Sequence, residues 1–110
     1  MDLVLSTNDD LNHLLGLVVS DMSAAFGYRS LVAESLVREY YCRFQDPAYC
    51  GSIGIPVQDD DFFFKEGMAM SLRVHYYLGL KGNPNPQAFS EWRSNQASDY
   101  RRRSWSESSV

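Results

Sequence analysis

The nineteen residues from Phe62 to Leu80 constrain the fold more than any other part of this sequence, because they form its longest apolar segment. Wound as an α-helix, the segment lines up one side with small or apolar residues: Phe63, Gly67, Met70, Val74 and Tyr77. A second stripe contains Met68, Leu72 and Tyr76. A helix that is apolar on two sides must be covered on both, by its own chain or by another molecule. We therefore predict a central helix at about 61–80.

The second half of this segment also fits a strand. Residues 72–80 alternate apolar and polar side chains with the period of a half-buried strand. The length of the whole apolar pattern favours a helix instead. The flanking residues also favour a helix: aspartates at 59–61 precede the apolar segment, and a Gly-Asn-Pro sequence at 82–84 follows it. Both are typical of helix ends, and three consecutive aspartates suit a helix start better than a calcium loop.

Two helices are predicted before the central one. The first covers residues 8–26, where leucine, valine and methionine recur at helical spacing and Ser6 or Thr7 is placed to cap the start. The second covers residues 30–44 and starts at a Ser30 cap. Its outer side carries Glu and Arg pairs four residues apart, as expected for a solvated surface.

The connection 46–60 contains prolines and glycines among apolar residues and is predicted to be one long ordered loop. Within it, residues 53–57 favour a short extended piece. A last helix is predicted over 86–101, because Asn85 and Pro86 form a typical helix start.

One hundred and ten residues are enough for one domain with a modest core. We predict an all-α, four-helix single domain over 1–103 and a flexible C-terminal tail at 104–110. The N-terminus lacks the features of a secretory signal, and no apolar run is long enough to cross a membrane. A cytoplasmic location without membrane contact is expected, with Cys42 and Cys50 as reduced thiols.

The side of the first helix opposite its apolar stripe carries small, uncharged residues. Gly16, Ser20 and Ala24 recur every four residues, with Leu17 beside them and His13 at the leading end. We call Gly16, Leu17, Ser20 and Ala24 the small-residue strip. Small side chains let a second backbone approach closely. Two ordinary interpretations stay open: another helix of the same domain covers the strip, or the strip is plain surface.

Charge is distributed unevenly along the chain. Residues 1–80 hold five basic and eleven acidic side chains, whereas residues 81–110 hold five basic and three acidic ones. An acidic body argues against nucleic-acid binding, because phosphate contacts need clustered lysine and arginine. A DNA-binding regulator that uses the arginines at 101–103 is the second alternative for the function, and the acidic outer side of the second helix speaks against it.

Catalytic chemistry has little support in the sequence. His13 and His75 do not form a metal-binding spacing, so no metal ligand, cofactor or catalytic residue is expected. The first alternative function is a small enzyme that uses the 47–58 loop, where Cys50 or Ser52 is the candidate nucleophile and His75 its base. A lowered pKa of the Cys50 thiol would favour this alternative, and a buried thiol would leave it without support.

These observations predict a small acidic, non-enzymatic protein-interaction module that forms a homodimer and masks a surface of another protein. An antiactivator of a transcription factor and an immunity-type inhibitor both fit this description. The expected partner-binding residues come from the small-residue strip and from the second stripe of the central helix: Gly16, Leu17, Ser20, Ala24, Met68, Leu72 and Tyr76. The long loop is expected to contribute to the same surface.

Overall fold

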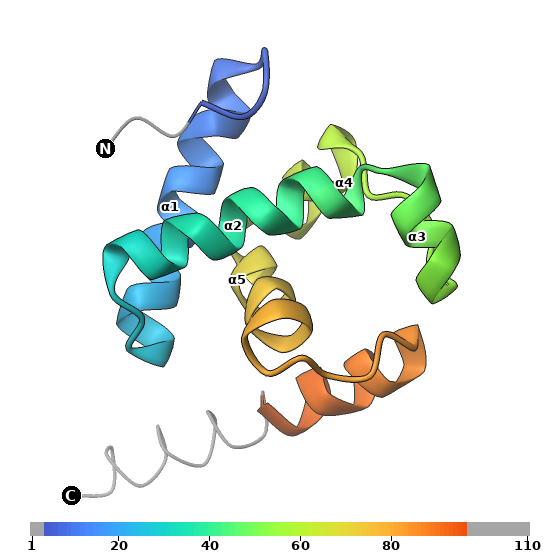
Figure 1. The fold of residues 1–110 in the computed structure, drawn as a ribbon. Helices are drawn as coiled ribbons and strands as arrows, with labels where there is room; N and C mark the ends of the chain where they lie inside the picture. Colours follow the sequence, from blue (N-terminus) through green and yellow to red (C-terminus); the bar gives the residue numbers. More distant parts are fainter. Residues whose placement is uncertain (1–3, 97–110) are drawn as a thin grey trace, which may run out of the picture.

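Helices α1 (Asp9–Phe26) and α2 (Ser30–Phe44) cross one another in the computed structural model, which describes residues 4–96 (Figure 1). This part of the chain is an all-α single domain, as predicted. The inner side of α1 is fully buried, and so is the side of α2 that faces it. The two predicted helices before the central one are therefore confirmed.

The caps of these helices differ from the prediction. Asn8, not Ser6 or Thr7, caps α1, because its side-chain oxygen accepts the N–H groups of Asp10 and Leu11. The hydroxyl of Ser6 is engaged elsewhere: it accepts the Asn8 N–H and donates to the Asp60 carboxylate.

The range predicted for α2 is correct, but its cap was predicted one residue too late. Ser30 is the first helical residue, and Arg29 occupies the cap position without a side-chain hydrogen bond. The turn before it begins at Gly27, whose φ of 75° suits the left-handed end of α1.

The central segment is helical as predicted, but it is not one continuous helix. It consists of α4 (Asp60–Glu66), the 3₁₀ turn η1 (Gly67–Ala69), α5 (Met70–Val74) and the π-helical turn η2 (His75–Gly79). The break falls at Gly67, whose φ of 57° and ψ of −132° lie outside the α-helical region. The strand alternative for residues 72–80 is wrong, since this stretch is helical up to Gly79.

The central segment runs beside α1 in the same direction. At its start the Asp60 carboxylate accepts a hydrogen bond of 3.0 Å from the Ser6 hydroxyl. Half-way along, the Ser71 hydroxyl donates to the Asp21 carboxylate at 2.5 Å. Its last turn stacks against Phe26 at the end of α1. These contacts fix the register between the two elements. The apolar side predicted for the central segment is buried except at Gly67.

The connection 46–60 is not one long loop. Its first half forms α3 (Pro47–Ile53), which is capped by the Asp46 side chain and starts at a proline, a favourable first helical residue. The extended piece predicted at 53–57 does not start where expected, because Ile53 ends α3 and Gly54 has a φ of 75°. No strand forms within residues 4–96. The remaining residues of the connection return along the end of α2, where the Gln58 N–H donates to the Phe44 carbonyl at 2.8 Å.

The last predicted helix is present over 86–96, up to the limit of the described residues. The Asn85 side chain caps it by accepting the Gln87 N–H at 2.8 Å, as the sequence predicted. In Figure 1 this orange helix lies against the end of the central segment. Its continuation to 101, the end of the domain at 103 and the tail at 104–110 lie outside the described residues.

Aromatic side chains join these elements into one core. Tyr40 and Phe44 of α2 stack on each other with ring centroids 3.9 Å apart, and Tyr77 packs against both rings. Phe89 of the last helix stacks on Tyr77 at 5.4 Å. None of the helices within residues 4–96 is long and apolar enough to cross a membrane.

Candidate functional site

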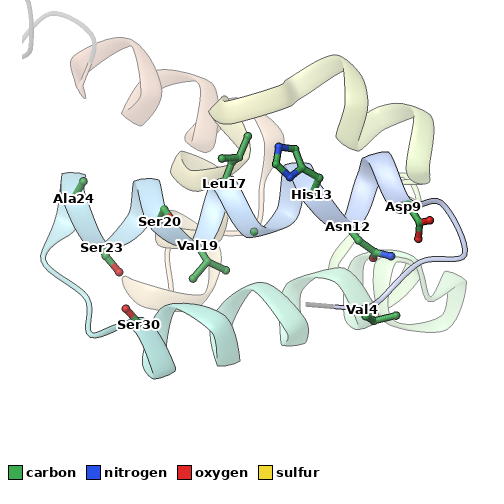
Figure 2. A pocket seen from close by; sticks show the side chains of 11 residues that line it. Val4, Asp9, Asn12, His13, Leu17, Val19, Ser20, Ser23, Ala24 and Ser30 are labelled. Carbon is green, nitrogen blue, oxygen red and sulfur yellow. The ribbon is translucent and has the colours of Figure 1, made fainter. Parts of the chain in front are cut away.

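An open groove of about 990 Å³ runs along the outer side of α1 (Figure 2). All four residues of the small-residue strip line it: Gly16, Leu17, Ser20 and Ala24. The groove extends from Val4 and Asp9 at one end to Ser30 of α2 at the other. No other part of residues 4–96 fills it. Of the two ordinary interpretations, cover by another helix of the described part is therefore excluded.

The lining of the groove is mostly uncharged. Among the described residues that line it, Asp9 alone carries a formal charge. Leu17, near the middle, leaves 44% of its surface exposed. Figure 2 shows the hydroxyls of Ser23 and Ser30 facing each other at the end away from Asp9, and the Ser23 hydroxyl is buried without a hydrogen-bond partner within residues 4–96. The groove thus offers an apolar centre with polar groups at its borders.

Gly16 lies inside α1, where no contact within residues 4–96 requires a glycine. A Cβ atom built on Gly16 meets no atom within 4 Å, and its φ is not positive. A glycine within a helix is unfavourable relative to alanine, because it loses more backbone entropy on folding. The absence of a side chain at this position therefore has no role within the described chain.

Replacing Gly16 with alanine is expected to raise the free energy of unfolding by about 0.5–1 kcal/mol in dilute solution. Urea denaturation at low micromolar concentration measures this change. Gly51→Ala in α3 is the matched control, because Gly51 is also helical and also free of contacts at its Cβ position. If the free energy of unfolding rises in Gly51→Ala but falls in Gly16→Ala, then α1 is packed at Gly16 in a way that the structure does not show.

The second predicted stripe does not contribute to the groove. Met68 is 42% exposed and Leu72 is half-buried, but neither lines the groove. Tyr76 is buried, with its ring against Phe89 and Trp92 of the last helix. The prediction that Tyr76 offers its side chain to a partner is therefore not supported, because the last helix covers it. The predicted contribution of the long loop is not seen in the groove either.

The candidates for an enzyme site are not brought together. Cys50 is fully buried and its Sγ lies 3.3 Å from the Phe44 carbonyl oxygen; burial raises the pKa of this thiol. The Ser52 hydroxyl donates to the Tyr49 carbonyl at 2.6 Å. No interaction joins either residue to His75 within the described chain. A buried thiol with a raised pKa is the opposite of an activated nucleophile.

The aspartates at 59–61 serve the fold. Asp59 caps α4 by accepting the N–H of Phe62. Asp60 accepts hydrogen bonds from the Tyr41 hydroxyl at 3.0 Å and the Gln45 amide at 2.7 Å, in addition to the bond from Ser6. Within residues 4–96, no three His, Cys, Asp or Glu side chains gather in a way that would hold a metal ion.

The arginines of α2 are paired within the helix. Arg38 binds Glu34 at 3.0 Å, and Arg43 binds Glu39 one turn earlier. These pairs confirm the predicted solvated side of α2 and leave it without a cluster of free positive charge. The arginines at 101–103 lie outside the described residues.

His75 lies in an aromatic contact that the sequence did not predict. Its ring stacks on Phe26 with centroids 3.9 Å apart, and its Nδ1 is 2.6 Å from the Tyr28 hydroxyl. The residues are far apart in the sequence, and no spacing rule links them. Desolvation by burial lowers the pKa of His75. The arrangement joins η2 to the turn after α1.

Acidification is expected to destabilise the protein through His75. Its pKa is lowered from 6.5 in the folded chain, so below pH 6.5 the unfolded chain binds a proton that the folded chain does not. Stability should therefore fall as the pH drops from 6.5 towards the lowered pKa, and this contribution should be constant above 6.5. Urea unfolding across this window measures the slope. His75→Gln should reduce the slope, whereas His13→Gln, at an exposed position, should keep it; an unchanged slope in His75→Gln would contradict this assignment.

No family model matches the chain, and no curated protein and no solved structure shows a significant match. The α1 groove is where the described chain brings four of the predicted binding residues together on one open surface.

Proposed function

We propose that this protein is a small non-enzymatic regulator that binds another protein through the α1 groove and masks a surface of that protein. The observation that carries the proposal is the uncharged, open floor of the groove, formed by the small-residue strip on a helix that is otherwise packed into the core. An antiactivator of a transcription factor and an immunity-type inhibitor are the two kinds of regulator that it covers. A cytoplasmic location stays a prediction of the sequence.

The shape of the groove suits an elongated protein element. The lining residues of α1 run from Asp9 to Ala24, which corresponds to about 22 Å along a helix axis. A partner helix of four turns has the same length. Gly16, Ser20 and Ala24 would let its backbone approach closely, and Leu17 would contribute apolar area. Protein interfaces commonly combine such an apolar centre with polar borders.

A masking function also agrees with the chemistry of the described residues. Masking needs a complementary surface and no catalytic group. The two candidate nucleophiles are occupied by structural contacts: Cys50 is buried and Ser52 binds a backbone carbonyl. The enzyme alternative therefore lacks the activated nucleophile that it requires.

The test is an affinity capture followed by a titration with the purified partner. Ser20→Glu places a charge on the floor of the groove, and Ser35→Glu places the same charge on the outer side of α2; both serines are exposed and helical. We expect Ser20→Glu to weaken partner binding by about tenfold or more, because a charge would be buried unpaired. Ser35→Glu should bind like the wild type.

The titration should also include an assay of the partner's own activity, which a masking protein inhibits. A partner that binds Ser20→Glu as tightly as the wild-type protein would contradict the use of the groove. A partner that binds with no change in its activity would contradict masking.

A further inference from the structure

We propose that a second copy of this chain occupies the α1 groove, with the two α1 helices packed antiparallel about a two-fold axis between Gly16 and Ser20. The inference rests on the proposed function, since it uses the same groove. It also names the molecule that occupies the groove, the direction in which the two α1 helices pack and the residues that meet between them. It also implies that a target protein competes with self-association.

The first observation is Gly16. The described chain leaves the space beyond its Cα empty, and a second molecule that approaches the helix closely would give the missing side chain a role. An axis midway between residues 16 and 20 sets Gly16 opposite Ser20 of the second copy, and Ser20 opposite Gly16 of that copy. Both contacts join two small residues, and small residues permit the closest approach that two helices make. Such an interface is self-complementary, as a two-fold dimer requires.

The second observation is the charge at the two ends of the groove. Asp9 lines one end. Arg29 directly precedes Ser30, which lines the other end, and Arg29 is exposed. Neither Asp9 nor Arg29 belongs to an ion pair within residues 4–96. Asp9 therefore lies in the groove at one end, and the exposed Arg29 is the neighbour in sequence of the residue that lines the other end.

The direction of packing follows from these charges. In the antiparallel register, residue 9 of one copy lies opposite residue 27 of the other, and Arg29 follows two residues after it in the turn between α1 and α2. The proposed packing thus brings Asp9 towards Arg29 of the second copy. The contact occurs twice, once at each end. A parallel arrangement would place Asp9 beside Asp9 and Arg29 beside Arg29, which is repulsive. A second copy of the chain therefore complements the groove in two ways: its small residues pack against the small residues at the centre, and its charges lie near the opposite charges at the ends.

The experiment is the solution mass by light scattering across a dilution series of the full chain at low salt. Wild type is expected to be a dimer that dissociates on dilution. Arg29→Asp and Asp9→Arg each convert the two attractive contacts into repulsive ones, so each should raise the dissociation constant by about tenfold or more. The double variant restores opposite charges with the positions exchanged, and its dissociation constant should return to near the wild-type value.

The variants are chosen to keep the fold. Arg29 occupies the cap position of α2 without a side-chain hydrogen bond, and aspartate is a preferred cap. Asp9 is an exposed residue in the first turn of α1, so its loss removes only a small helix-dipole contribution. Circular dichroism confirms the helical content of each variant.

Three results would overturn the inference. These are a wild-type monomer at all concentrations, a dimer that neither single variant weakens, and a double variant no stronger than the single ones. The proposed function fails by a different result. A monomer whose capture of another protein is still abolished by Ser20→Glu would refute only the dimer. A charge-dependent dimer that captures no other protein would refute only the masking function.

Discussion

Replacing Phe44 with alanine is expected to lower the free energy of unfolding by about 3–5 kcal/mol. The Phe44 ring is fully buried where α2, α3 and η2 meet: it stacks on Tyr40, and Tyr49 and Tyr77 lie against it at 5.5 and 5.2 Å. Alanine removes all three ring contacts and leaves a cavity that surrounding backbone cannot close. Small domains are stable by only about 5–15 kcal/mol, so this change alone removes a large part of the total.

Urea denaturation followed by circular dichroism measures the loss. Phe64→Ala is the matched control, because Phe64 belongs to α4 and is 41% exposed. We expect its effect to be about 1 kcal/mol or less. Equal losses in the two variants would mean that the core is not centred on the aromatic cluster of α2.

Gly82→Ala is expected to destabilise the protein by about 1–3 kcal/mol through overpacking. A Cβ atom at Gly82 would lie 2.4 Å from the ring of Tyr76. That ring cannot move aside easily, because it is buried between Phe89 and Trp92 and its hydroxyl donates to the Asn83 carbonyl at 2.7 Å. Relieving the clash requires the last helix or the turn before it to shift.

Thermal unfolding of Gly82→Ala beside Gly51→Ala tests this assignment. Both variants reduce the flexibility of the unfolded chain equally, so their difference reports the contact with Tyr76. A Gly82→Ala variant as stable as Gly51→Ala would show that the turn accommodates a side chain and that Tyr76 is not held as described.

The sequence predicted the elements of the fold that depend on local patterns. The apolar periodicity of residues 8–26 and 30–44 is strong and uninterrupted, and both helices form. The Asn85-Pro86 start and the acidic start of the central segment also depend on nearby residues, and both were correct. Local signals of this kind predict the structure correctly because they depend on residues within or next to the same helix.

Features that depend on tertiary contacts were not predictable. Gly67 occurs at a position compatible with a continuous helix, and only packing sets its positive φ. The α3 helix was missed because Gly51 and Gly54 suggested a loop, although Gly54 only ends the helix with its φ of 75°. The contact between Tyr28 and His75 joins residues that no sequence period relates.

The candidate site was predicted in part. The small-residue strip was recognised from its four-residue spacing, and its residues do line one groove. The stripe of Met68, Leu72 and Tyr76 was assigned to partner binding because a helix that is apolar on two sides must be covered on both. The last helix covers Tyr76 of this stripe, whereas Met68 stays 42% exposed. Spacing indicates which residues share a side of a helix, whereas which side stays open depends on how the helices pack.

The most direct test of the groove as a protein-binding site is photo-crosslinking in cells of the source organism. A photoreactive amino acid replaces Ser20 in the groove or, as a control, Ser35 on the outer side of α2. We predict covalent protein adducts from position 20 and none from position 35, including a product at twice the mass of the chain that represents the second copy. Illumination that gives no adduct at position 20, or the same adducts at both positions, would contradict the account.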